Sequence, residues 1–182
     1  MPKITIDIKE KIRSLSKADL EKIVLKLAGK DKSVYDYLLV NYIDTECGEQ
    51  DLFEEARSDL DILFRKGYKG YSEQLRMANM LAACTKRINE FTRISNNQKL
   101  EADLLMYVLD VPFSGNIDIF GTCFTTCDSK TAIMLRRLIN VVTTKLHPDY
   151  KVDYQEIINT YLEILHRRAN HLNIIYTLPK SI

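Results

Sequence analysis

The chain contains few residues that interrupt helices. Its 182 residues include only six glycines and four prolines. Because both residue types are unfavourable inside helices, their scarcity favours helices joined by short turns and leaves little room for long linkers. No apolar run approaches the roughly 20 residues that a membrane-spanning helix needs. We therefore expect no interaction with the membrane interior.

The first ten residues lack the apolar segment of a secretory signal and carry acidic side chains instead. With no such signal, the four cysteines favour reduced thiols over a disulfide framework. These two observations predict a cytoplasmic protein. Its length suits one domain covering residues 1–182, with 1–95 and 96–182 as the sub-bundles into which it would divide.

Catalytic and cofactor motifs are also missing from the sequence. It contains no Gly-x-Ser-x-Gly elbow, Walker loop, Rossmann glycine fingerprint or His-Glu-x-x-His. Glu163 and His166 have the spacing used in di-iron bundles, but no second Glu-x-x-His completes such a site. Cys123 and Cys127 are one residue too far apart for a zinc knuckle and have no second pair. We predict no enzyme activity, no cofactor and no bound metal.

Amphipathic helices fill most of the chain. In residues 72–94, apolar side chains recur at alternating spacings of four and three, which places them on one side of a helix. The members of this row are Met77, Leu81, Cys84, Ile88 and Phe91. A second apolar row on the same segment indicates contact with more than one neighbour, so we predict that this helix is the centre of the fold.

The same periodicity predicts an all-α fold of seven to eight antiparallel helices, arranged as a single bundle or as a short stack like a helical repeat. The expected helices cover residues 5–13, 17–28, 31–42, 50–66, 72–94, 98–109, 129–146 and 153–175. Ser16 is expected to cap the second helix, and Gly29 to end it in a left-handed conformation. Eight side chains are expected in the core: Leu27, Leu60, Leu81, Ile88, Leu138, Val142, Leu162 and Leu165.

Residues 110–128 are the least regular part of the sequence. They combine proline, glycine and residues that favour strands, and we expect a loop with a helical turn there; a small hairpin is the alternative. Four apolar residues in this segment, Phe113, Ile117, Phe120 and Phe124, form a candidate partner surface. The competing interpretation is that these side chains fold back onto the bundle.

Charge alternates along the chain in blocks. Residues 44–61 and 100–128 are strongly acidic, whereas 62–99 and 129–182 are basic, and the net charge is only +1. The simplest interpretation is that neighbouring helices of opposite charge attract each other across the bundle surface.

The favoured functional hypothesis is a helical interaction or scaffold module that binds a protein partner or a second copy of itself. The alternative is a nucleic-acid-binding protein that uses basic helix faces around residues 86–93 and 130–145. Its candidate phosphate-contacting residues are Lys86, Arg87, Arg93, Arg136 and Arg137.

A family resemblance concerns the first 40 residues. The segment Leu15–Leu27, which reads LSKADLEKIVLKL, is followed by Val34–Leu39, which reads VYDYLL. This pattern resembles the start of uncharacterised all-helical bacterial proteins that are grouped as domains of unknown function. The resemblance implies a helical fold and a bacterial source, and it brings no catalytic residues.

Overall fold

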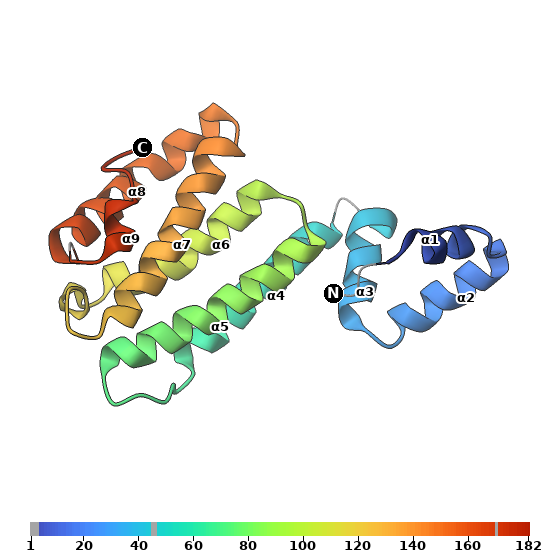
Figure 1. Ribbon diagram of the computed structural model, residues 1–182, viewed down its shortest axis with the longest axis horizontal. Helices are drawn as coiled ribbons and strands as arrows, with labels where there is room; N and C mark the ends of the chain where they lie inside the picture. The colour runs from blue at the N-terminus through green and yellow to red at the C-terminus, as the bar shows by residue number, and fades with distance from the viewer. Residues whose placement is uncertain (1–3, 45–46, 170) are drawn as a thin grey trace. The chain divides into compact units, whose positions relative to one another are not determined.

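The computed structural model describes residues 4–44, 47–169 and 171–182, and within these ranges the protein is all-α, with no strand (Figure 1). The elements are α1 (Ile6–Arg13), α2 (Lys17–Ala28), α3 (Lys32–Leu38), the π-helical turn η1 (Leu39–Ile43), α4 (Gly48–Arg65), α5 (Glu73–Ile94), α6 (Gln98–Ser114), the 3-10 turn η2 (Ile117–Ile119), α7 (Thr125–Thr144), α8 (Pro148–Arg168) and α9 (Asn173–Tyr176). The chain groups by its contacts into two compact units, Met1–Glu49 and Gln50–Ile182.

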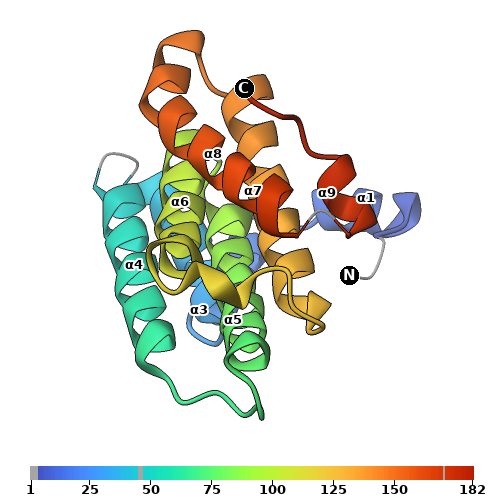
Figure 2. The same ribbon diagram turned by 90° about the vertical axis from the view of Figure 1, so that its left-hand side faces the viewer.

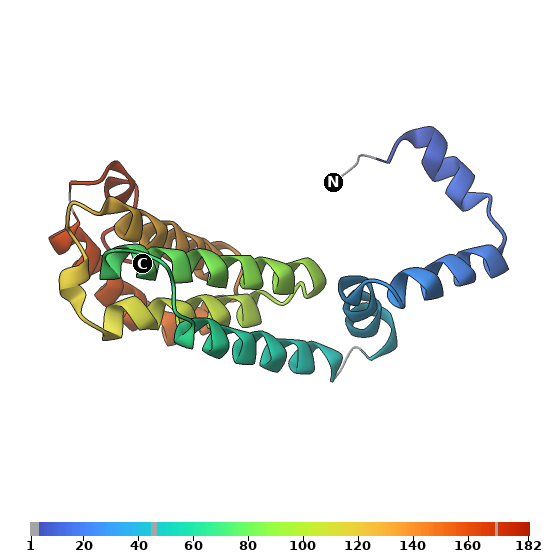
Figure 3. The same cartoon turned by 90° about the horizontal axis from the view of Figure 1, so that it is seen from below.

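The first unit holds α1, α2 and α3, which follow one another through short bends (Figure 3). Ser16 caps α2 as expected: its hydroxyl accepts the Asp19 backbone N–H at 3.1 Å and donates to the Asp19 carboxylate at 2.6 Å. The expectation for Gly29 is wrong. Its φ of −72° is right-handed, because the chain turns through backbone bonds from Lys30 and Asp31 to the Leu27 carbonyl.

The second unit is a helical bundle in which α5, α6, α7 and α8 lie side by side (Figures 1 and 2). Its central helix is α7, which packs against α5, α6, α8 and α9. The prediction that residues 72–94 form the centre is therefore wrong, although α5 does pack against α6 and α7 and also contacts α4 through the Phe53–Phe91 rings and the Arg87–Asp59 ion pair. A wide apolar arc shows that a helix has several neighbours, but it does not show which helix has the most.

Helices α4 and α5 form an antiparallel hairpin, in line with the antiparallel helices that the sequence predicts. Ser72 caps α5 by accepting the backbone N–H of Leu75 at 3.2 Å. Four of the five residues of the predicted apolar row, from Leu81 to Phe91, are buried, and the fifth, Met77, is half-buried. Seven of the eight side chains predicted to lie in the core are buried: Leu60, Leu81, Ile88, Leu138, Val142, Leu162 and Leu165.

The eighth core prediction, Leu27, is wrong because this side chain is 49% exposed. Leu27 belongs to the apolar row of α2, and neither α1 nor α2 has a buried residue. Helical periodicity identifies the side of a helix that would be buried, but the covering surface must come from another part of the molecule.

The irregular segment is more helical than expected. The helix predicted to end at Leu109 continues to Ser114 with Pro112 inside it. The turn η2 follows, which confirms the expected loop with a helical turn rather than a hairpin. Helix α7 then begins at Thr125, before the expected start at residue 129.

The last predicted helix, 153–175, is divided into α8 and α9. It begins earlier than expected because Pro148 occupies the first helical turn, where its missing N–H costs nothing. At the other end of α8, Gly121 approaches the backbone so closely that a Cβ atom at this position would lie 2.1 Å from the Arg168 carbonyl oxygen. The φ of Gly121, +75°, also favours glycine.

Candidate binding surfaces

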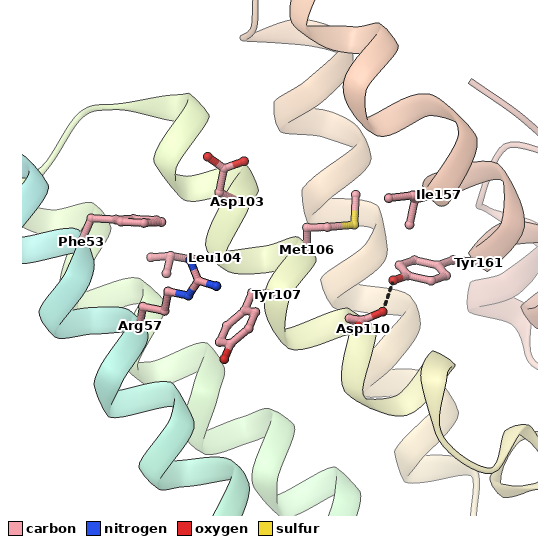
Figure 4. A pocket seen from close by; sticks show the side chains of 9 residues that line it. All are labelled: Phe53, Arg57, Asp103, Leu104, Met106, Tyr107, Asp110, Ile157 and Tyr161. Carbon is pink, nitrogen blue, oxygen red and sulfur yellow. Dashed lines mark hydrogen bonds between the residues drawn. The ribbon is translucent and has the colours of Figure 1, made fainter.

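A groove of about 300 Å³ lies on the second unit, between α4, α6 and α8 (Figure 4). Its apolar lining includes Leu104, Met106 and Ile157, and its polar lining includes Asp103 and Asp110. These two carboxylates are seven residues apart on α6, so they lie on one side of that helix about 10.5 Å apart along its axis.

The carboxylates around this groove accept hydrogen bonds from tyrosine hydroxyl groups. Tyr154 donates to Asp103 at 2.5 Å and Tyr161 donates to Asp110 at 3.3 Å. Burial raises the pKa of Tyr154, with a smaller contribution from the Asp103 carboxylate. Burial likewise raises the pKa of Tyr161, followed by the effect of Asp110. Both phenols therefore remain protonated donors at neutral pH.

Cationic side chains of the protein lie beside the aromatic and acidic residues of the groove. The guanidinium of Arg57 lies 4.8 Å from the centre of the Tyr107 ring, a cation–π distance. The Tyr107 hydroxyl donates to Asp61, and this bond is the main cause of the raised pKa of Tyr107. Lys99 reaches Asp103 at 3.3 Å. Because the protein itself supplies the cations and hydroxyl donors for these carboxylates, they serve first to hold α4, α6 and α8 together.

The aromatic residues of the irregular segment do not form one exposed surface. The rings of Phe113 and Phe120 are 5.2 Å apart, and Phe113 also stacks on Tyr161 at 4.0 Å. Both phenylalanines are buried, so the candidate partner surface is wrong for them and the alternative of packing onto the bundle holds. Ile117 is half-buried, and Phe124 is exposed.

Two of the five candidate phosphate-contacting residues form ion pairs with carboxylates of the same chain. Arg87 pairs with Asp59 at 2.6 Å, and Arg137 pairs with Glu101 at 2.8 Å. Each pair joins a basic block of the sequence to the preceding acidic block, as the charge pattern predicts. The other three residues, Lys86, Arg93 and Arg136, are exposed, and Lys86 lies 3.9 Å from Glu90.

The sequence patterns with metal-binding spacing do not come together as a site. Within residues 4–44, 47–169 and 171–182, no three histidine, cysteine, aspartate or glutamate side chains are placed to share an ion. A ring nitrogen of His166 lies 3.0 Å from the Pro179 carbonyl oxygen.

The cysteines differ in environment. Cys47 and Cys123 are exposed, whereas Cys84 and Cys127 are buried, and all four are free thiols. Burial raises the pKa of Cys84 and that of Cys127 to about 12. Since the thiolate is the reactive form, the two buried thiols behave as small apolar groups.

One buried carboxylate was not anticipated from the sequence. Asp128 is fully buried on α7, where one of its oxygens accepts the Gly121 backbone N–H at 3.1 Å. Among the residues that the structure describes, the other oxygen has no partner, and neither has the buried hydroxyl of Thr131 one turn later. Burial raises the pKa of Asp128, while the Gly121 hydrogen bond and His171 lower it by less.

The second candidate surface is the pair of apolar rows on α1 and α2. Ile8 and Ile12 are four residues apart on α1 and are 47% and 43% exposed. On α2, Ile23 is 44% exposed, and Val24 and Leu27 of the same row are similarly open. Exposed contiguous apolar rows of this kind are typical of interaction sites.

None of the helices in residues 4–44, 47–169 and 171–182 is long and apolar enough to span a bilayer. The chain matches no protein-family model, and comparisons with curated proteins and with solved structures gave no significant match.

Proposed function

We propose that the protein is a helical interaction module that binds another protein through the apolar rows of α1 and α2. The observation that supports this function is that neither helix buries a single side chain, although both carry apolar rows at helical spacing. Isolated helices of 8 and 12 residues are marginal in water. Covering these rows with a partner would therefore stabilise the helices and remove apolar surface from water at the same time.

The nucleic-acid alternative has less support. Arg87 and Arg137 are paired with Asp59 and Glu101, so less positive charge is available for phosphates than the sequence alone suggests. Phosphate binding also weakens steeply with salt, because it releases counterions. An apolar contact changes little with salt, which separates the two functions in one experiment.

The test is a pull-down from a lysate of the source organism with purified protein, at low and high salt. We expect recovery of a protein partner that survives high salt and is lost with Ile23→Glu, which places a charge in the apolar row. Lys22→Glu changes the neighbouring exposed residue outside that row and should leave recovery intact. Equal recovery with both variants, or recovery of salt-sensitive nucleic acid instead, would contradict the proposal.

A further inference from the structure

The charges beside the apolar row of α2 form a self-complementary pattern. Leu20 and Ile23 occupy the core positions of a short heptad, and Leu27 begins the next one. Asp19 and Lys26 flank this row on the same side, seven residues apart. Both side chains are exposed, and within residues 4–44, 47–169 and 171–182 neither of them has an ion-pair partner.

We infer that the partner of α2 is a second copy of the chain, bound antiparallel through this row. This inference rests on the proposed function and names its partner. In an antiparallel pair, Leu20 of one copy faces Ile23 of the other, and the twofold axis generates the same contact a second time. With this register, residues 15–28 of the two copies overlap along their full length.

The flanking charges select this register. Asp19 of each copy lies beside Lys26 of the other, so the dimer contains two symmetry-related ion pairs. The neighbouring register, in which Ile23 faces Leu27, brings Lys26 of one copy beside Lys26 of the other. Like charges in that position disfavour it.

The size of the contact sets its strength. One 12-residue helix from each copy forms an interface smaller than the roughly 1,200–2,000 Å² of stable complexes. We therefore expect a dimer that depends on protein concentration, with a dissociation constant in the micromolar range or weaker.

Charge exchange between two variants provides the test, measured by sedimentation velocity across a concentration series. In a dimer of Asp19→Lys, each of the two pairs brings a lysine at position 19 beside Lys26 of the other copy. In a dimer of Lys26→Asp, each pair brings Asp19 beside an aspartate at position 26. Each variant alone should associate about tenfold more weakly than the wild type, because an exposed ion pair contributes up to about 1 kcal/mol and two are lost. An equimolar mixture restores both pairs as a heterodimer, so it should associate like the wild type.

Circular dichroism of each variant checks that α2 remains helical, since Asp19 also contributes to the Ser16 cap. Ile23→Glu should abolish association, whereas Leu25→Glu, on the opposite side of α2, should leave it unchanged.

A wild-type protein that stays monomeric at millimolar concentration would overturn the inference. So would a mixture of the charge variants that associates no more tightly than either alone. If Ile23→Glu nevertheless eliminates capture of a different protein, the proposed function stands and only the identity of the partner is wrong.

Discussion

Replacing Arg137 with methionine should destabilise the second unit by about 2–3 kcal/mol. The Arg137 guanidinium contacts the Glu101 carboxylate of α6 at 2.8 Å and the Asn89 side chain of α5 at 2.6 Å, so it joins three helices. The Glu101 side chain is only 6% exposed. Removing the arginine would leave this carboxylate buried without its main partner.

The magnitude follows from the burial of the two side chains. Removing one member of a fully buried ion pair costs about 3–5 kcal/mol. Arg137 is 28% exposed, and Lys145 remains 4.0 Å from Glu101, so the cost should lie below that range. Replacing Glu101 and Arg137 together with methionine removes both charges, and we expect stability within about 1 kcal/mol of the wild type.

Urea unfolding followed by circular dichroism measures these differences. With a slope of about 2 kcal/mol per molar urea, the midpoint for Arg137→Met should fall by about 1–1.5 M. Arg136→Met is the matched control: this neighbour is exposed, and its replacement should change stability by less than about 0.5 kcal/mol. Equal urea midpoints for the two variants would refute the structural role of Arg137. The Arg137 guanidinium would then count as available for phosphate binding.

Three further outcomes follow from the buried side chains and from the close backbone approach at Gly121. Burial raises the pKa of Asp128 above its ordinary value of 3.8, so the folded protein binds the carboxyl proton more tightly than the unfolded chain and loses stability as pH rises through the folded pKa. Asp128→Asn should remove that loss. Identical pH profiles of the unfolding free energy for the wild type and the variant would contradict this prediction. Gly121→Ala should lower the melting temperature, because its Cβ would lie 2.1 Å from the Arg168 carbonyl oxygen; an unchanged temperature would show that the contact can relax. A colorimetric thiol assay should show two fast thiols and two, Cys84 and Cys127, that react only on unfolding; four equal rates would be inconsistent with their burial.

Helical periodicity predicted the core of the second unit well, because each row there has a neighbouring helix to cover it. Leu60, Leu138 and Leu162 are buried for this reason. The same pattern on α2 leads to the wrong expectation for Leu27, since the sequence shows which side of a helix is apolar but not whether another element reaches it. Pro148 was a readable signal for the start of α8, because proline favours the first helical turn.

The polar contacts of the groove could not be predicted from the sequence, for a different reason. Tyr154 and Asp103 are 51 residues apart in sequence, and their hydrogen bond depends on the relative rotation of α8 and α6. The charge pattern of the sequence does not depend on the relative rotation of the helices. The alternating blocks predicted attraction between neighbouring helices, and the Arg137–Glu101 pair is an example. The helix packing decides which residues of two blocks form a pair, and no local sequence pattern predicts that packing.

The central position of α7 has a consequence for synthesis on the ribosome. The chain emerges from its N-terminus, so α5 and α6 leave the ribosome before the helix that packs against both of them. Until residues 125–144 follow, the apolar sides of α5 and α6 face solvent or chaperones. Exposed apolar surface in incomplete chains promotes aggregation. We therefore expect nascent chains that end before residue 125 to depend on chaperones for solubility, and chains that extend beyond residue 144 to depend on them less.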